Sequence, residues 1–279
     1  ALVLQVMNPH KTGKIVMFSM DYHMMWHWFE LIPFIALAVL GGILGALFNR
    51  ANITIGKMRF NSTLKRLPII EAILVATFTA LLRYWNPFMR GSTNDLLAGL
   101  FNNSCDGEWS VDPLFRDACN IKNYVVIIEL IFTGFVFLLL TIITFGLRLP
   151  SGLFIPTLAM GACFGHALGS LMKYLQETFP SHWFFSECQI GGEAKACVLP
   201  GIYALTGAAA CLAGVTRVTV SIVVIMFELT GGLEYIVPLM LTVLVSKWVG
   251  DAFEKESIYE MYIHEQGYPY IDNKVELDP

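Results

Sequence analysis

The stretch GLRLPSGLFIP, from Gly146 to Pro156, interrupts two long apolar runs. The runs extend over residues 125–145 and 153–171, and without the interruption they would form one apolar segment. Glycine and proline at this density do not continue a helix, so the backbone must open here and a second helix must begin. In lipid, such a break is tolerated only where protein or a water-filled cavity satisfies the backbone. The sequence therefore predicts a helix that begins inside the protein.

The first turn of this second helix is expected to carry free backbone N–H groups. They belong to Leu153, Phe154 and Ile155, and Pro156 fits there because a proline near a helix start forfeits no intrahelical hydrogen bond. The positive end of a helix favours a negative ligand, and interrupted membrane helices that aim this end at a substrate recur in transporters. The stretch thus outlines an anion site. The alternative is a simple Gly/Pro-rich turn between two helices at the membrane surface.

Composition indicates a membrane protein. Of the 279 residues, 56% are hydrophobic and only 14% are charged, whereas a soluble domain carries about 25% charged residues. The net charge of -4 gives no reason to expect a nucleic-acid partner or an acidic substrate. The chain opens on Ala1 without an initiator Met or a recognisable signal peptide, so we expect a piece of a longer protein.

The apolar segments have uneven lengths, which favours tilted and partly re-entrant helices in an all-α membrane protein. The segments cover residues 31–48, 69–82, 125–145, 153–171, 199–215, 218–227 and 235–246. Few of them match the roughly 20 residues of a simple spanning helix. Small residues recur at four-residue spacing, which lets membrane helices pack closely. They are Gly41 and Gly45, then Gly161, Gly165 and Gly169, and then Gly207, Cys211 and the nearby Gly214.

Loop charges predict the orientation in the membrane. Residues 50–66 contain basic but no acidic side chains, which places them in the cytoplasm by the positive-inside rule. The connections 85–122 and 173–199 then lie on the outer side. Glycosylation sequons occur at Asn52, Asn61 and Asn102, and only Asn102 lies in an outer loop. We therefore expect a glycan at Asn102 and none at the other two.

Four of the six cysteines lie in the two expected outer loops, and in an oxidising lumen we expect them to form disulfides whose pairing stays open. These are Cys105, Cys119, Cys188 and Cys197. A zinc site has less support, because the spacings are not Cys-x-x-Cys and only His182 lies nearby. Cys163 and Cys211 lie in apolar segments, where we expect them to pack. No metal site is expected.

Three stretches resemble the CLC family of chloride channels and transporters. GLRLPSGLFIPTLAMGACFG resembles the segment in which a Gly-x-Phe-x-Pro signature, here Gly152 to Pro156, opens a helix at the central chloride site. VVIMFELTGGLEYIVPLM is similar to the family's later helices, which include much of its dimer interface, and resembles the endosomal chloride/proton exchangers most. The opening, residues 8–50, resembles the same branch. The resemblance implies that the backbone amides of Leu153 and Phe154 bind chloride, with Gly152, Ile155 and Pro156 forming the start of the site helix.

The C-terminal part contains another candidate. Ser257 and Glu260 have capping-box spacing, so a short helix should begin there with Tyr259 in its first turn. The residues alone favour an interfacial tyrosine. The resemblance implies instead the family's central tyrosine, whose hydroxyl helps to coordinate chloride. It also implies that residues 1–256 are second-half CLC transmembrane helices, and that residues 257–279 are the final short helix and the start of the linker to cytoplasmic CBS domains.

The resemblance covers the second of the family's two inverted repeats and its final helix. The family's serine motif, gating glutamate and proton-accepting glutamate belong to the first repeat and have no match here. Acidic residues in membrane segments invite a proton-relay interpretation. Glu71, Glu129 and Glu234 lie near segment ends, where capping or snorkelling is the simpler interpretation. Glu228 lies deeper, and we expect it to cap or to pair with Arg217 or another buried donor.

The function implied by the resemblance is voltage-driven chloride transport across an intracellular membrane, as a chloride/proton antiporter. Chloride is then the substrate, and no organic cofactor is expected in this segment. The implied partners are chloride and protons, the lipid bilayer, the first half of the transmembrane domain and a second copy in a homodimer. The implied location is an endosomal or other intracellular vesicle membrane. A passive chloride channel of the same family is the alternative.

Two interpretations from other classes have less support. An intramembrane hydrolase would use Ser151 as nucleophile with His166, but there is no Gly-x-Ser-x-Gly elbow and His166 lies about four turns further along the helix. In such a position a histidine more often packs or is satisfied by a neighbour. A non-transporting scaffold or regulatory subunit would fit a half-length chain, but not the retained pattern of Phe154 and Tyr259.

Overall fold

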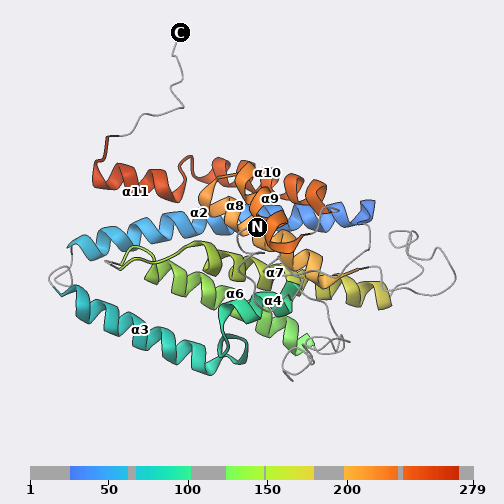
Figure 1. Cartoon of the computed structure of the whole chain (residues 1–279), viewed down its shortest axis with the longest axis horizontal. Coiled ribbons are helices and arrows are strands. Elements are labelled where there is room, and N and C mark those ends of the chain that lie inside the picture. Colours follow the sequence, from blue (N-terminus) through green and yellow to red (C-terminus); the bar gives the residue numbers. More distant parts are fainter. Residues whose placement is uncertain are drawn as a thin grey trace, which may run out of the picture.

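The computed structural model describes residues 26–61, 67–101, 124–147, 149–178, 198–231 and 235–269. Within these ranges the chain forms helices and their connections, and no strand (Figure 1). In chain order the helices are η1 (Trp28–Glu30), α2 (Leu31–Asn61), α3 (Pro68–Trp85), η3 (Pro87–Met89), α4 (Thr93–Phe101), α6 (Tyr124–Thr144), α7 (Phe154–Thr178), α8 (Pro200–Thr216), α9 (Val220–Thr230), α10 (Ile236–Phe253) and α11 (Ile258–Gln266). The predicted all-α fold class is confirmed.

Several helices are long and apolar enough to cross a membrane. Five such stretches occur in the described part of the chain: Trp28–Arg59, Pro68–Trp85, Val125–Thr144, Phe154–Thr178 and Ile236–Gln266. The helices α8 and α9 are apolar but shorter, as the uneven segment lengths predicted. The helix α2 continues to Asn61, well past the apolar segment that ends at Phe48. Much of the expected cytoplasmic loop is therefore helical, because this part of the sequence holds no proline to end the helix.

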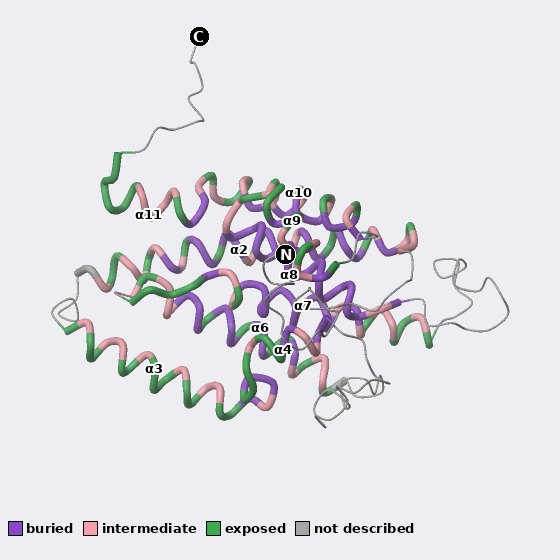
Figure 2. Tube along the Cα trace, viewed as in Figure 1, coloured by how far each residue is buried: buried purple, intermediate pink, exposed green. Residues whose placement is uncertain are grey.

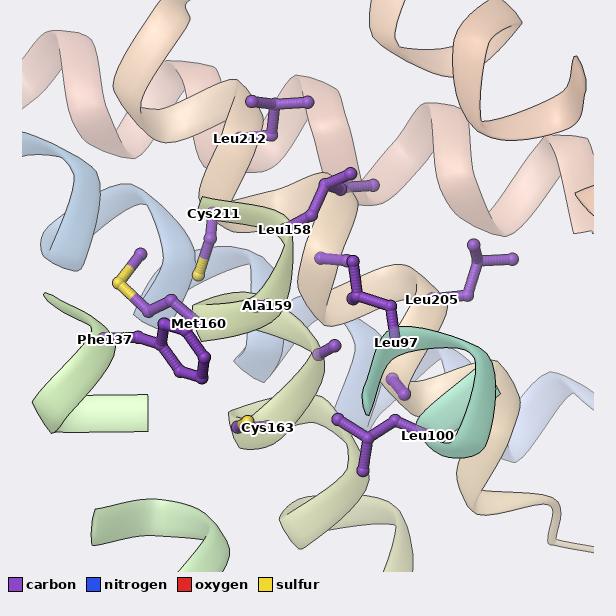
Figure 3. Close-up of a cluster of buried hydrophobic side chains, with 14 of the residues drawn as sticks. Leu97, Leu100, Phe137, Leu158, Ala159, Met160, Cys163, Leu205, Cys211 and Leu212 are labelled. Carbon is purple, nitrogen blue, oxygen red and sulfur yellow. The ribbon is translucent and has the colours of Figure 1, made fainter. Parts of the chain in front are cut away.

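The helix α8 lies at the centre of the molecule. It packs against α7, α2 and α10, and all its residues from Pro200 to Val215 are buried (Figure 2). A cluster of buried side chains joins α7 and α8 to α4 (Figure 3). It includes Leu97, Leu100, Leu158, Cys163, Leu205 and Cys211. Cys163 and Cys211 are buried free thiols, so the prediction that they pack in the core is confirmed.

Small residues allow the close approach of α8 to its neighbours. A Cβ atom added at Gly207 would lie 2.5 Å from the carbonyl oxygen of Gly161 and 2.9 Å from the Cα of Gly165. A Cβ added at Gly41 of α2 would likewise lie 2.7 Å from the Cβ of Ala210 in α8. These separations are too short for any side chain, so the predicted close packing through small residues is confirmed.

Two partly buried arginines join helix ends. The Nε of Arg59, near the end of α2, lies 2.9 Å from the Oε1 of Glu71 in the first turn of α3. Arg217, at the end of α8, forms an ion pair with Asp251 of α10 and donates to the carbonyl oxygen of Gly250 at 2.9 Å. Of the alternatives expected for Glu228, the pairing with Arg217 is wrong. Arg217 caps α8 in the left-handed conformation (φ 62°) and its guanidinium reaches α10, while Glu228 is exposed on α9.

Candidate anion site

The predicted break between the two apolar helices is present. The helix α6 ends at Thr144, Gly146 has a φ of +92°, and α7 begins at Phe154. A positive φ is strained for residues other than glycine, so Gly146 is where the backbone turns away from the helical path. Residues 149–152 are exposed and not helical.

The start of α7 has the predicted free end. The first intrahelical hydrogen bond runs from the N–H of Thr157 to the carbonyl oxygen of Leu153, at 3.2 Å. Leu153 therefore lies just before the helix rather than in it, one residue from the predicted start. The N–H groups of Phe154 and Ile155 belong to the first turn, where an α-helix offers no intrahelical acceptor, and Pro156 has no N–H.

The surroundings of this helix start are open on one side. Leu153 is buried, Phe154 is half-buried, and a Cβ added at Gly152 would have no atom within 4 Å. The side chain of Thr157 turns back into the helix, where its Oγ1 donates to the carbonyl oxygens of Leu153 and Phe154 at 2.8 and 2.9 Å. The positive end of α7 is thus accessible, and its field favours an anion.

The capping box predicted in front of Tyr259 is confirmed. The N–H of Ser257 donates to Glu260 Oε2 at 2.7 Å, and the N–H of Glu260 donates to Ser257 Oγ at 3.3 Å. Tyr259 follows in the first turn of α11 with its side chain half exposed. Among the described residues, the Tyr259 hydroxyl makes no hydrogen bond, either to the first turn of α7 or to any other group.

Another tyrosine of α11 does contact the break. The hydroxyl of Tyr262 fills the space that a Cβ of Gly146 would need. It also donates to the Oδ1 of Asn52 in α2, at 2.7 Å. Sequence reasoning missed Tyr262, and it considered Asn52 only as a sequon. The available signal was an asparagine in a segment without proline, where its amide needs partners once buried.

Both polar atoms of the Asn52 side chain form hydrogen bonds inside the protein. Its side chain is buried, and its Nδ2 donates to the carbonyl oxygens of Ile142 and Phe145 at 2.9 Å each. This burial supports the expectation that Asn52 carries no glycan. The side chain of Asn61 and the whole of Asn102 lie outside the described residues.

The other candidate residues do not form a chemical site in the described part of the chain. His166 is buried in α7, and its Nδ1 lies 3.2 Å from the carbonyl oxygen of Leu100, so the interpretation as a satisfied core histidine is confirmed. Within the described ranges, no group of three His, Cys, Asp or Glu side chains has the arrangement of a metal site. Six other candidates lie outside the described residues: Cys105, Cys119, Cys188, Cys197, His182 and Glu234.

The fold and the site together define a class of protein, an all-α membrane protein in which an interrupted helix pair presents a positive helix start. A family model described as "Voltage gated chloride channel" matches residues 1–251. The chain therefore belongs to this family, the CLC family, as the sequence predicted.

Sequence identities to individual relatives support this membership. The chain is 43% identical over 292 residues to H(+)/Cl(-) exchange transporter 3 of Homo sapiens, and 43% identical over 292 residues to exchange transporter 5 of Homo sapiens. Each match covers 99% of this chain and 35% of the relative. The chain thus spans about a third of the length of these relatives.

Solved structures share the fold. A crystal structure of a eukaryotic CLC transporter is similar at a TM-score of 0.58 with 30% identity, over 85% of this chain and 35% of that one. A slow cyanobacterial Cl-/H+ antiporter gives a TM-score of 0.58 with 22% identity, over 91% of this chain and 51% of that one. The second similarity concerns the fold alone.

Proposed function

We propose that this chain forms the second half of the transmembrane domain of a chloride/proton antiporter. The observation that carries the proposal is the break between α6 and α7, after which α7 begins with free N–H groups at Phe154 and Ile155. The names of the relatives, which are H(+)/Cl(-) exchange transporters, supply the substrates. No covalent step is proposed, and the intramembrane hydrolase has no support from the family or from the position of His166.

In this proposal, the anion site replaces part of the hydration shell of chloride. The backbone amides of Leu153 and Phe154 bind the ion, with Gly152, Ile155 and Pro156 forming the helix start, and the hydroxyl of Tyr259 closes the site. Support comes from the open surroundings of the α7 start and from the half-exposed position of Tyr259. A site built from weak donors binds an anion strongly enough to admit it and weakly enough to release it.

The remaining parts of the proposal concern the whole protein. Residues 1–256 form second-half transmembrane helices, and residues 257–279 form the final helix and the start of a linker to CBS domains. The complete protein is a homodimer in an endosomal or other intracellular vesicle membrane, with the first half of the domain supplying the groups that handle protons. The identities to exchange transporters support this assignment.

The experiment uses the complete protein purified into liposomes, with an imposed chloride gradient and a pH electrode outside. Proton movement against its own gradient, driven by chloride, is the expected result. Chloride flux without proton movement would make the protein a passive channel and overturn the antiport assignment alone. The absence of chloride flux above protein-free liposomes would overturn the proposed function as a whole.

A further inference from the structure

The helix α11 is anchored at two points on either side of Tyr259. Ile258 is completely buried in the core, and Tyr262 is bonded to Asn52 through its hydroxyl at 2.7 Å. Tyr259 lies between these anchors with half of its side chain exposed. Residues three apart on a helix are neighbours on its surface, so Tyr262 and Tyr259 lie next to each other. The position of Tyr259 therefore depends on how firmly Tyr262 is held.

Asn52 connects three helices at one place. Its Oδ1 accepts from Tyr262 of α11, and its Nδ2 donates to the carbonyl oxygens of Ile142 and Phe145 at the end of α6. The last carbonyl groups of a helix have no intrahelical donor, so a buried side-chain amide is a suitable partner for them. Asn52 itself belongs to α2 and is 1% exposed. The amide thus fixes α11 to the residues immediately before the break.

The ring of Tyr262 contacts the residues before the break, as its hydroxyl does. It packs edge-on against the ring of Phe145, with centroids 5.6 Å apart and an interplanar angle of 83°. The hydroxyl occupies the space beside Gly146 where any other residue would place its Cβ. The contact between α11 and the break is therefore made by both the apolar body and the polar tip of one side chain.

The second polar link between α11 and α2 is weaker. Lys57 Nζ lies 3.2 Å from Glu265 Oε2, and both side chains are about half exposed (57% and 45%). Exposed ion pairs of this kind contribute little, because water competes for both charges. In the hydrogen bond between Tyr262 and Asn52, Tyr262 is half-buried and Asn52 is buried, so water competes less for these groups. This bond is therefore the stronger polar constraint on α11.

We propose that Tyr262 and Asn52 are positioning residues for the anion site. They hold α11, and with it Tyr259, at a fixed place relative to the break that leads into α7. The inference rests on the proposed function, because it assigns Tyr259 a role at that site. Removing the Tyr262 hydroxyl leaves the Oδ1 of Asn52 buried without its donor and loosens α11 beside Tyr259. Neither residue touches the ion.

The test compares Tyr262→Phe with Tyr268→Phe in the complete protein in liposomes. Tyr262→Phe keeps the ring against Phe145 and removes only the hydroxyl, whereas the Tyr268 side chain is 63% exposed and serves as the control. We expect Tyr262→Phe to weaken the apparent chloride affinity about threefold or more, the effect of one lost buried hydrogen bond, and to lower the number of protons moved per chloride. Asn52→Ala should weaken the affinity at least as much, because it also removes the hydrogen bonds to the carbonyl oxygens of Ile142 and Phe145. Tyr268→Phe should have no effect.

A double-variant comparison distinguishes positioning from a purely structural role. If Tyr262 acts through Tyr259, then adding Tyr262→Phe to Tyr259→Phe should weaken chloride affinity no further. Wild-type chloride affinity and coupling in both Tyr262→Phe and Asn52→Ala, with only a lower melting temperature, would overturn the proposal. So would full additivity with Tyr259→Phe. Absence of chloride transport by the wild type would instead overturn the proposed function.

Discussion

Two tyrosines one turn apart on α11 have different surroundings. Tyr262 donates to Asn52 and packs on Phe145, whereas Tyr259 is half exposed and its hydroxyl makes no hydrogen bond among the described residues. A hydroxyl that is held in place but unbonded can offer its proton to a ligand. At the level of single residues, Tyr259 thus suits binding and Tyr262 suits positioning.

The replacement Tyr259→Phe should weaken chloride binding by about tenfold or less, because it removes one neutral hydrogen-bond donor worth roughly 0.5–1.5 kcal/mol. The melting temperature should not change, since the hydroxyl stabilises nothing in the described structure. Isothermal titration of the complete purified protein with chloride measures the first quantity. Unchanged chloride binding would contradict the assignment of Tyr259 to the anion site.

At the level of elements, the break between α6 and α7 depends on one of its two glycines more than on the other. Gly146 has a positive φ and is crowded by Tyr262, whereas Gly152 has an ordinary φ and open space around it. The glycine of the Gly-x-Phe-x-Pro signature is therefore not needed for the turn itself.

The replacement Gly146→Ala should destabilise the protein, because an alanine at positive φ costs roughly 1–2 kcal/mol and its Cβ would displace the Tyr262 hydroxyl. Gly152→Ala is the matched control for stability, since it places the same methyl group in open space. Thermal unfolding in detergent, followed by the fraction that stays monodisperse, measures both. Equal melting temperatures for the two variants would contradict this account of the break.

At the level of the whole molecule, the central and the peripheral helices differ sharply in how far their residues are buried. The residues of α8 are buried almost without exception, while α3 has no buried residue (Figure 2). Both α9 and α10 expose large apolar side chains. Among these are Val220, Val224, Val237, Met240, Leu244 and Trp248. A membrane protein can cover such faces with lipid or with a second copy, and we expect the proposed homodimer to use the face of α9 and α10.

Single cysteines on this face should link two copies of the complete protein. Because a twofold interface places the same patch of both subunits together, Val224→Cys or Val237→Cys should give a band of doubled mass under mild oxidation in membranes. Ile73→Cys on α3 is the control, since Ile73 is exposed to a similar degree on another face. A doubled band from Ile73→Cys, with none from α9 or α10, would contradict the proposed interface.

The sequence by itself determined the features that depend on neighbours along the chain. These are the break after α6, the free start of α7, the capping box before Tyr259 and the spaced small residues that allow close helix packing. Each follows from local backbone chemistry: glycine and proline end helices, Ser257 and Glu260 satisfy first-turn amides, and glycine admits a close helix.

Only the tertiary structure decided which polar side chains meet. Asn52 and Tyr262 lie 210 residues apart in sequence, and Arg217 reaches Asp251 rather than Glu228. A buried polar group must find a partner, but its own sequence does not say which of several candidates folding will bring near. The packing of the helices determines the partner, so the hydrogen bonds of Asn52 follow only from the way α2, α6 and α11 lie together.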